Sequence, residues 1–178
     1  MKFHRKASHQ LKQGFTLLEV LVVIAIIAVL ASITVGGIGF YKRKAAESKT
    51  EVFIASVSQA LDEYKSDEGV YPTDGADGSE GSSSVVYEAL YGDADGDGEV
   101  DDDAEAYLAT LNPNSTGPAL NVQESDGSYV LMDGWKNELR YRSPGDQNPD
   151  FDLWSAGADM ETNLANDGDD AKDDIDNW

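Results

Sequence analysis

The segment Gly14-Phe15-Thr16-Leu17-Leu18-Glu19 opens a long, mostly apolar stretch that runs from residue 15 to residue 40. Its centre, residues 20–31, contains no polar side chain. About 20 apolar residues are enough for a helix to span the hydrocarbon core of a bilayer, so this stretch predicts a transmembrane helix. Glu19 is the exception within it. Because a carboxylate inside an apolar helix is costly unless it is paired, Glu19 is a candidate functional residue.

The residues before Phe15 are basic and polar, and they contain no acidic side chain. A basic segment ahead of an apolar one favours a cytoplasmic N-terminus. Three interpretations compete for residues 15–40: a conventional signal peptide cleaved after Ala31, an ordinary membrane anchor, and a segment that is processed and then assembled. The first two leave Glu19 unexplained.

Gly14, Phe15 and Glu19, at this spacing before an apolar run, resemble the processing and assembly signature of type IV pilins and pseudopilins. The resemblance implies that a prepilin peptidase cuts between Gly14 and Phe15 and methylates the new amine of Phe15. It also implies that Glu19 lies near the cationic amine of a neighbouring subunit in a filament. Such a pair offsets the cost of burying the carboxylate, which neither of the other interpretations does.

The charge and composition of the chain exclude several classes of protein. The net charge is -21, and every acidic residue except Glu19 follows residue 41. Such a surface repels nucleic acid phosphates, so no nucleic acid partner is expected. The chain has no Cys, and both histidines, His4 and His9, precede Gly14. A mature chain therefore lacks a thiolate, a His base and the usual zinc ligands, and we expect no enzyme.

A second helical pattern follows the apolar stretch. Apolar side chains recur at steps of three and four residues and form one stripe that consists of Phe53, Val57, Ala60, Leu61 and Tyr64. This periodicity predicts that one helix continues from Phe15 to Tyr64, with an apolar first half and an amphipathic second half.

Past Gly69 the pattern changes to short elements separated by turns. Residues 85–90 and 104–111 predict short helices, and residues 128–132, 139–142 and 151–155 predict three strands. The predicted fold class is α+β: a long N-terminal helix packed on a small three-stranded antiparallel sheet, as in pilins. The predicted division is a leader at 1–14, a transmembrane and assembly helix at 15–40, and a globular domain at 41–178.

Several later segments are similar to the major pseudopilins of type II secretion systems. They are Ala60 to Thr73, Gly134-Trp135-Lys136-Asn137, Tyr141 to Gly145, Asp152 to Asp159, and Asp174 to Trp178. The chain departs from that family at Lys136 and Glu138, where the family usually has glycine and proline.

That resemblance implies a structural subunit that polymerises through its N-terminal helix and helps to export folded proteins across the outer membrane. Before assembly it would cross the inner membrane once, in contact with the lipid bilayer, with its C-terminal domain in the periplasm. The implied partners are further copies of the chain, the prepilin peptidase, the minor pseudopilins and the inner-membrane assembly platform. Two alternatives stay open: another pilus-like filament for adhesion or DNA uptake, and a secreted calcium-binding module with a conventional signal peptide.

The resemblance also implies calcium in the C-terminal loop. Carried over by position, Asp159 supplies a side chain, Ala156 a carbonyl and Asp174 a carboxylate, which Asp173 shares or replaces. Calcium takes about six to eight oxygen ligands and accepts carboxylates together with backbone carbonyls. The alternative is a solvated acidic tail.

A second acidic cluster resembles an EF-hand or dockerin loop and consists of Asp93, Asp95, Asp97, Glu99 and Asp101. Oxygen-bearing side chains occupy the first, third, fifth and ninth loop positions, and glycine occupies the sixth. The twelfth position, which usually carries a bidentate acid, is Ala104. The cluster therefore predicts either a second calcium site or a solvated acidic loop.

Overall fold

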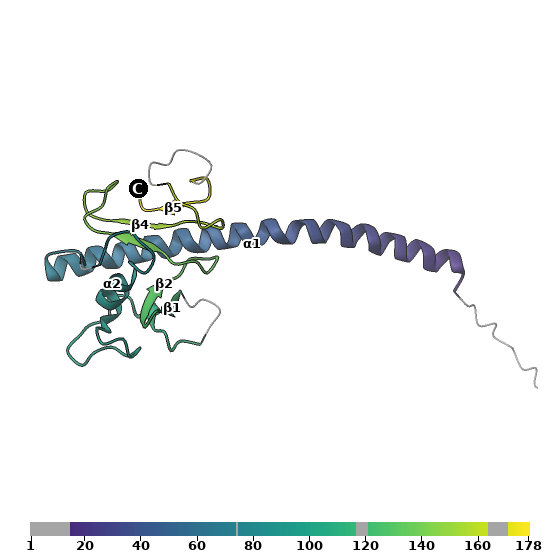
Figure 1. Cartoon of the computed structure of the whole chain (residues 1–178). Coiled ribbons are helices and arrows are strands. Elements are labelled where there is room, and N and C mark those ends of the chain that lie inside the picture. The colour runs from purple at the N-terminus through teal and green to yellow at the C-terminus, as the bar shows by residue number, and fades with distance from the viewer. Residues whose placement is uncertain (1–14, 74, 117–120, 164–170) are drawn as a thin grey trace, which may run out of the picture. The chain divides into compact units, whose positions relative to one another are not determined.

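The computed structural model describes residues 15–73, 75–116, 121–163 and 171–178, without the side chains of residues 33–38 (Figure 1). The chain divides into two compact units, Met1–Tyr41 and Lys42–Trp178. Each unit is described by itself below. The predicted leader, residues 1–14, lies outside the described residues.

Helix α1 (Leu17–Glu68) supplies residues to both units. It ends at Gly69, whose φ of 83 is easy for a residue without Cβ, and whose N–H donates to the carbonyl of Lys65 at 2.8 Å. The helix predicted from Phe15 to Tyr64 is therefore confirmed from Leu17 onward, and it extends to Glu68.

The predicted apolar stripe of α1 faces the core of the unit Lys42–Trp178. Phe53, Val57, Ala60 and Leu61 are buried, and Tyr64 is half-buried against them. These side chains join a single hydrophobic cluster with residues from the strands and the short helices. The amphipathic half of the helix is thus stabilised by burial of one face, as its periodicity indicates.

Short helical turns follow α1: α2 (Ser84–Tyr87), the π-helical turn η1 (Glu88–Gly92) and the 3-10 turn η2 (Ala109–Leu111). The first two confirm the helix predicted at 85–90. The helix predicted at 104–111 is wrong except for its last turn. The reason is a tertiary contact, since the N–H of Leu108 donates to the carbonyl of Leu90 at 3.0 Å instead of bonding within a helix.

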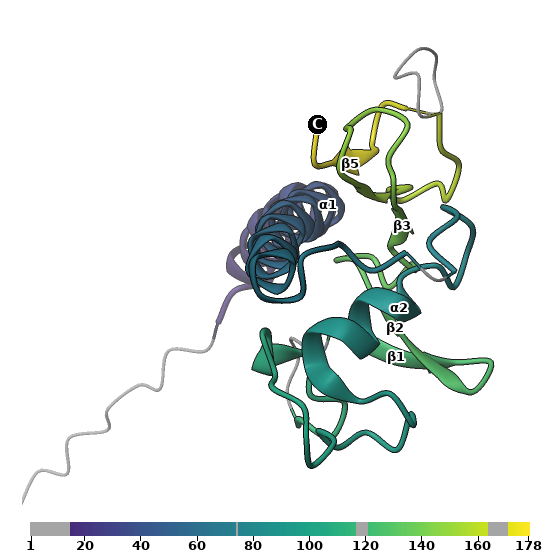
Figure 2. The ribbon, with the colours of Figure 1, turned by 90° about the vertical axis from the view of Figure 1, so that its left-hand side faces the viewer.

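Five strands form two antiparallel sheets: β1 (Val122–Ser125), β2 (Ser128–Leu131), β3 (Arg140–Arg142), β4 (Asp152–Ser155) and β5 (Ile175–Asp176). One sheet has the strand order β1-β2, in which Val122 lies opposite Leu131. The other has the strand order β3-β4-β5, in which Trp154 on the central strand lies opposite Arg140 on one side and Asp176 on the other. Figure 2 shows the β3-β4-β5 sheet and the β1-β2 pair with α2 beside α1. The α+β class and a three-stranded sheet are confirmed.

The membership of that sheet differs from the prediction. The predicted strand at 128–132 exists as β2, but it pairs with β1, and β5 takes the third place beside β4. The end of β2 meets the segment before β3 only around a tight turn, through an isolated antiparallel bridge between Met132 and Glu138. The buried carboxylate of Asp133 accepts hydrogen bonds from the N–H groups of Trp135 and Asn137, both at 2.8 Å, and turns the chain after β2.

The same turn is fixed to two other elements. The second carboxylate oxygen of Asp133 accepts a 2.6 Å hydrogen bond from Ser155 on β4. The N–H of Gly134 donates to Thr50 Oγ1 on α1 at 2.9 Å. Lys136 has a φ of 75 in this turn, a conformation that glycine adopts with less strain.

Candidate assembly segment and calcium-binding loops

The predicted assembly segment begins at Phe15, just before α1, and Gly14 lies outside the described residues. Every described side chain from Phe15 to Ser32 is exposed, including large apolar ones such as Phe15 at 86% and Leu17 at 83%. Among the residues that the structure describes, no helix is both long and apolar enough to cross a membrane. An exposed apolar surface of this extent marks a site of interaction.

Glu19 caps the start of α1 together with Thr16. Its Oε2 accepts hydrogen bonds from the N–H of Thr16 at 2.8 Å and from Thr16 Oγ1 at 2.9 Å. In return, the N–H of Glu19 donates to Thr16 Oγ1 at 3.2 Å. This reciprocal pattern is a capping box, which satisfies backbone donors that have no partner within the helix. The role of Thr16 was not predicted, although the spacing Thr-x-x-Glu indicates it.

The C-terminal loop lies between β4 and β5. Ala156 is buried directly after β4, and Asp173 Oδ2 accepts a 2.7 Å hydrogen bond from the N–H of Ala158. Asp174 Oδ2 accepts hydrogen bonds from Thr162 Oγ1 at 3.0 Å and from the N–H of Asn163 at 3.3 Å. The other carboxylate oxygen of Asp174, Oδ1, is buried and has no hydrogen-bond partner among the described residues.

The electrostatics of this loop favour a cation. Burial raises the pKa of Asp174, hydrogen bonds from Thr162 and Asn163 oppose that rise, and the charges of Asp159 and Asp173 add to it. The three carboxylates are therefore close enough to repel one another. Within the described part of the chain, their oxygens do not all lie within 4.8 Å of one another.

The donors of this loop fit calcium. All of them are oxygens, which a hard cation prefers, and the buried Oδ1 of Asp174 lacks the partner that a cation would supply. Asp159 Oδ1 is engaged within the loop, because it accepts a 3.0 Å hydrogen bond from the N–H of Glu161. Residues 164–170, which contain further aspartates of this loop, lie outside the described residues.

The second acidic loop follows η1 and brings three carboxylates together. One oxygen each from Asp93, Asp95 and Asp97 lies within 4.8 Å of the others. Asp93 is fully buried, and it accepts hydrogen bonds from the N–H groups of Asp97 at 3.0 Å and Gly98 at 2.9 Å and from the Tyr87 hydroxyl at 2.7 Å. These donors neutralise part of its charge, so the loop can adopt this shape without an ion.

Glu99 and Asp101 lie outside that group of three. The N–H of Glu99 donates to Asp97 Oδ1 at 2.8 Å, and its own side chain is exposed. Asp101 closes the loop, since its Oδ2 accepts a 3.0 Å hydrogen bond from the N–H of Ala94. The loop is also fixed from outside by Asn114, whose side-chain amide donates to the carbonyl of Gly98 at 2.9 Å. No pattern in the sequence signalled that contact.

Two family models match the chain. Residues 10–35 match the prokaryotic N-terminal methylation motif, and residues 103–178 match type II secretion system protein G.

Three similar proteins are each named type II secretion system core protein G. The one from Vibrio cholerae is 33% identical over 168 residues, which are 93% of this chain and 90% of the relative. The one from Escherichia coli is 33% identical over 170 residues, 94% of this chain and 91% of the relative. The third, from Pseudomonas aeruginosa, is 29% identical over 170 residues, 94% of this chain and 95% of the relative. This chain therefore belongs to the family of type II secretion system core protein G.

Proposed function

We propose that this chain is the structural subunit of a type II secretion pseudopilus and polymerises through its N-terminal helix to help export folded proteins across the outer membrane. The observation that carries the proposal is the start of α1. There, a long exposed apolar surface lies within the matched methylation motif and contains one acid, Glu19. An isolated chain leaves this surface without a cover, and further copies of the chain supply one.

Glu19 is the residue that we propose to pair between copies. After cleavage between Gly14 and Phe15, the new amine of Phe15 is cationic, and methylation keeps it so. In the filament this amine would approach the Glu19 carboxylate of a neighbouring copy. The capping box places that carboxylate at the first turn of α1, one turn from the new terminus, where it can accept a further hydrogen bond.

The remaining parts of the proposal concern location and partners. Before assembly, the N-terminal segment anchors the chain once in the inner membrane, with the acidic domain in the periplasm. Its partners are further copies, the prepilin peptidase, the minor pseudopilins and the inner-membrane assembly platform. The subunit has no catalytic role. Neither a pilus for adhesion or DNA uptake nor a secreted module is favoured by a described residue.

Mass spectrometry of the mature chain tests this proposal. We expect the protein isolated from membranes to begin at Phe15 and to carry one methyl group on its amine. A matched Gly14→Ile variant should stay uncleaved, because a β-branched side chain replaces the only residue without Cβ at the cleavage point. A mature chain that begins at Ser32 would instead identify a conventional signal peptide and would contradict the proposal.

The C-terminal loop is the part of the subunit that we propose binds calcium. Asp174 and Asp159 would supply carboxylate oxygens, Ala156 its carbonyl, and Asp173 a further carboxylate. Bound calcium would neutralise the repulsion among these carboxylates and so hold the loop against β4 and β5. The chain itself contributes the hydrogen bond from Thr162 Oγ1, which orients the Asp174 carboxylate so that Oδ1 points inward.

A calcium titration with the Asp174→Asn variant tests this site. We expect the variant to bind calcium at least about tenfold more weakly than the wild type, because even the loss of a partner that only orients a metal ligand costs about 10- to 100-fold in affinity, and this substitution removes a proposed ligand's charge. The matched control is Glu161→Gln, which removes an exposed carboxylate from the same loop and should leave the affinity unchanged. Equal affinity in all three proteins would contradict the site.

The loop from Asp93 to Asp101 stays a prediction as a second calcium site. Only Asp93, Asp95 and Asp97 lie together, and Asp93 already has three hydrogen-bond donors. The stoichiometry of the same titration separates the two interpretations of this loop. Two ions per chain support a second site, and one ion per chain supports a solvated acidic loop.

A further inference from the structure

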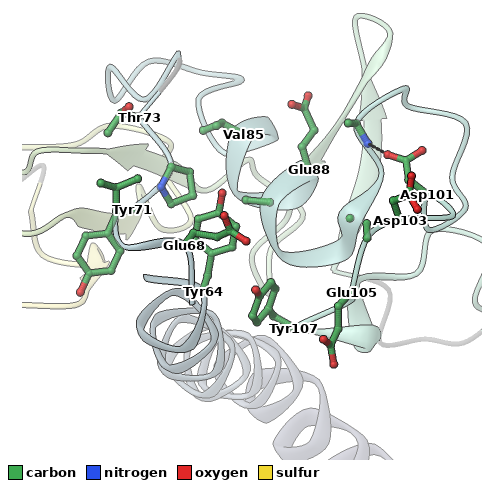
Figure 3. Close-up of a pocket in the computed structure, with 16 residues that line it drawn as sticks. Tyr64, Glu68, Tyr71, Thr73, Val85, Glu88, Asp101, Asp103, Glu105 and Tyr107 are labelled. Atoms are coloured by element: carbon green, nitrogen blue, oxygen red, sulfur yellow. Dashed lines mark hydrogen bonds between the residues drawn. The ribbon is translucent and has the colours of Figure 1, made fainter. Parts of the chain in front are cut away.

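A groove of about 770 Å³ opens beside the C-terminal end of α1, within the unit Lys42–Trp178 (Figure 3). Five of its 16 lining residues are acidic, and they come from three separate segments: Glu68, Glu88, Asp101, Asp103 and Glu105. No described residue that lines the groove is basic. The groove thus gathers negative charge around a hollow, which favours a cationic occupant.

Two aromatic rings form part of the same groove. Tyr64 and Tyr107 meet edge to face, with ring centroids 5.4 Å apart, and both are half-buried. Burial raises the pKa of Tyr107, and the charges of Asp67, Glu68 and Glu105 add to the effect. A cation is attracted both to the face of such a ring and to the surrounding carboxylates.

The basic residue next to Tyr64 in the sequence does not neutralise the groove. Lys65 instead forms an ion pair with Asp150, with Nζ 3.0 Å from Oδ1. The same ammonium lies over the ring of Tyr71, 4.2 Å from its centroid. Lys65 is therefore already engaged by a carboxylate and a ring.

The chain carries one concentrated basic segment after its leader, Lys42-Arg43-Lys44 on α1. All three side chains are exposed. Lys44 pairs with Glu47 at 2.6 Å. Within the described ranges, the side chains of Lys42 and Arg43 form no hydrogen bond and no ion pair. This basic segment and the acidic groove are complementary in charge.

The basic segment cannot fill the groove of its own chain. Both features belong to one helix, and at 1.5 Å per residue Lys44 lies about 36 Å from Glu68 along the helix axis. A side chain does not span that distance, and the helix between them is continuous. Contact between the two therefore requires two copies that are displaced along the helix axis by a similar distance.

We propose that the groove lined by Glu68, Glu88 and Glu105 receives the basic segment Lys42–Lys44 of a second copy of this chain. The proposal rests on the proposed function, because it describes a contact between subunits of the filament. In this contact, Lys42 and Arg43 lie among the groove carboxylates and against Tyr64 and Tyr107. This contact would add attraction between opposite charges to the apolar contact of the N-terminal helices, and it would fix the displacement of one copy relative to the next along the helix axis.

Cross-linking in the full-length chain tests the contact, because the chain has no Cys. The test variant is Lys42→Cys with Glu105→Cys, treated with a short bismaleimide reagent in membranes and in filaments. The matched control is Lys42→Cys with Glu124→Cys, since Glu124 is an exposed acid on β1 that does not line the groove. We expect covalent dimers and longer ladders from the test variant and little product from the control.

Charge reversal gives a second measurement. Lys42→Glu with Arg43→Glu should lower filament yield by about fivefold, as expected from the loss of exposed ion pairs. Glu68→Lys with Glu105→Lys in the same chain should restore it. If the reversed basic segment lowered the yield only through a general effect of charge on folding or export, reversing the groove as well would not restore the yield.

Two outcomes would overturn the contact. One is filaments with no cross-link between residues 42 and 105, or with equal product from the control pair. The other is a reversed groove that fails to restore the yield, which would show that the groove carboxylates do not pair with Lys42 and Arg43 of another copy. A wild-type chain that is cleaved but forms no filament would contradict the proposed function instead. In that case, cross-linking in membranes still decides whether copies meet through the groove.

Discussion

Glu19→Leu should be cleaved and inserted normally but should assemble into filaments poorly, with a yield lower by roughly 100-fold. The magnitude follows from the cost of leaving one member of a buried ion pair without its partner, roughly 3 kcal/mol. In the proposed filament, that unpaired member is the amine of Phe15. Mass spectrometry of the mature chain and electron microscopy of sheared filaments measure the two halves of this expectation.

Glu19→Gln separates the ion pair from the helix cap. Glutamine can still complete a capping box with Thr16, so it keeps the local structure and removes only the charge. If the charge pairs with the neighbouring amine, Gln and Leu variants should both assemble poorly. Normal filaments from Glu19→Gln would show that Glu19 acts only as a cap and would contradict the pairing.

Gly134→Ala should unfold the domain at a much lower temperature than the wild type. A Cβ at residue 134 would lie 2.7 Å from the Cα of Ala46 on α1 and still closer to its carbonyl oxygen. Since both neighbours are backbone atoms, the turn can relieve the clash only by moving off the helix, which also breaks the hydrogen bond to Thr50. We expect a loss of about 3 kcal/mol, or about 10 °C in Tm.

Tryptophan fluorescence during thermal unfolding measures this effect, because Trp135 follows the substituted residue and Trp154 is buried nearby in the sheet. Gly39→Ala is the matched control. A Cβ there meets no atom within 4 Å, and alanine raises helix stability by about 1 kcal/mol. An unchanged Tm for Gly134→Ala would show that the turn does not press against α1.

The long helix and its buried stripe could be predicted because both depend on local periodicity. Phe53, Val57 and Leu61 recur at helical spacing, so the sequence alone indicates which face is buried. The end of the helix at Gly69 was harder to place, because the apolar pattern stops at Tyr64 while the backbone stays helical to Glu68.

The rest of the fold depends on contacts between distant residues. β5 is two residues long, and only its pairing with Trp154 and Ser155 makes it a strand. The helix predicted at 104–111 does not form before Ala109, because the N–H of Leu108 donates to the carbonyl of Leu90. No local sequence pattern reveals that long-range hydrogen bond. β2 and β3 were expected in one sheet, but the chain beside them pairs only around the Asp133 turn, through the bridge between Met132 and Glu138 and the 2.8 Å hydrogen bond from the Leu139 N–H to the Leu131 carbonyl.

The candidate site residues show the same division. The position of Glu19 follows from its sequence spacing, and so does the grouping of Asp93, Asp95 and Asp97 on one tight loop. The hydrogen bond from Thr162 to Asp174 joins two segments on either side of residues 164–170 and has no short-range signal. The sequence could therefore name the acids of the C-terminal loop but could not say which oxygen lacks a partner.

The contact between Thr50 and Gly134 has a mechanical consequence. Within the unit Lys42–Trp178, Thr50 is the first buried residue of α1 in chain order, so a pull along the helix toward its N-terminal end reaches this contact before the rest of the buried stripe. The core residues Phe53, Val57 and Leu61 follow along the direction of pull, and they carry the load in shear. Rupture in shear requires the whole stripe to slide together by about one helical turn, 5.4 Å, whereas peeling would break its contacts one at a time. A pull along the axis of α1 is therefore expected to meet more resistance than a pull that lifts the helix from the sheets one residue at a time.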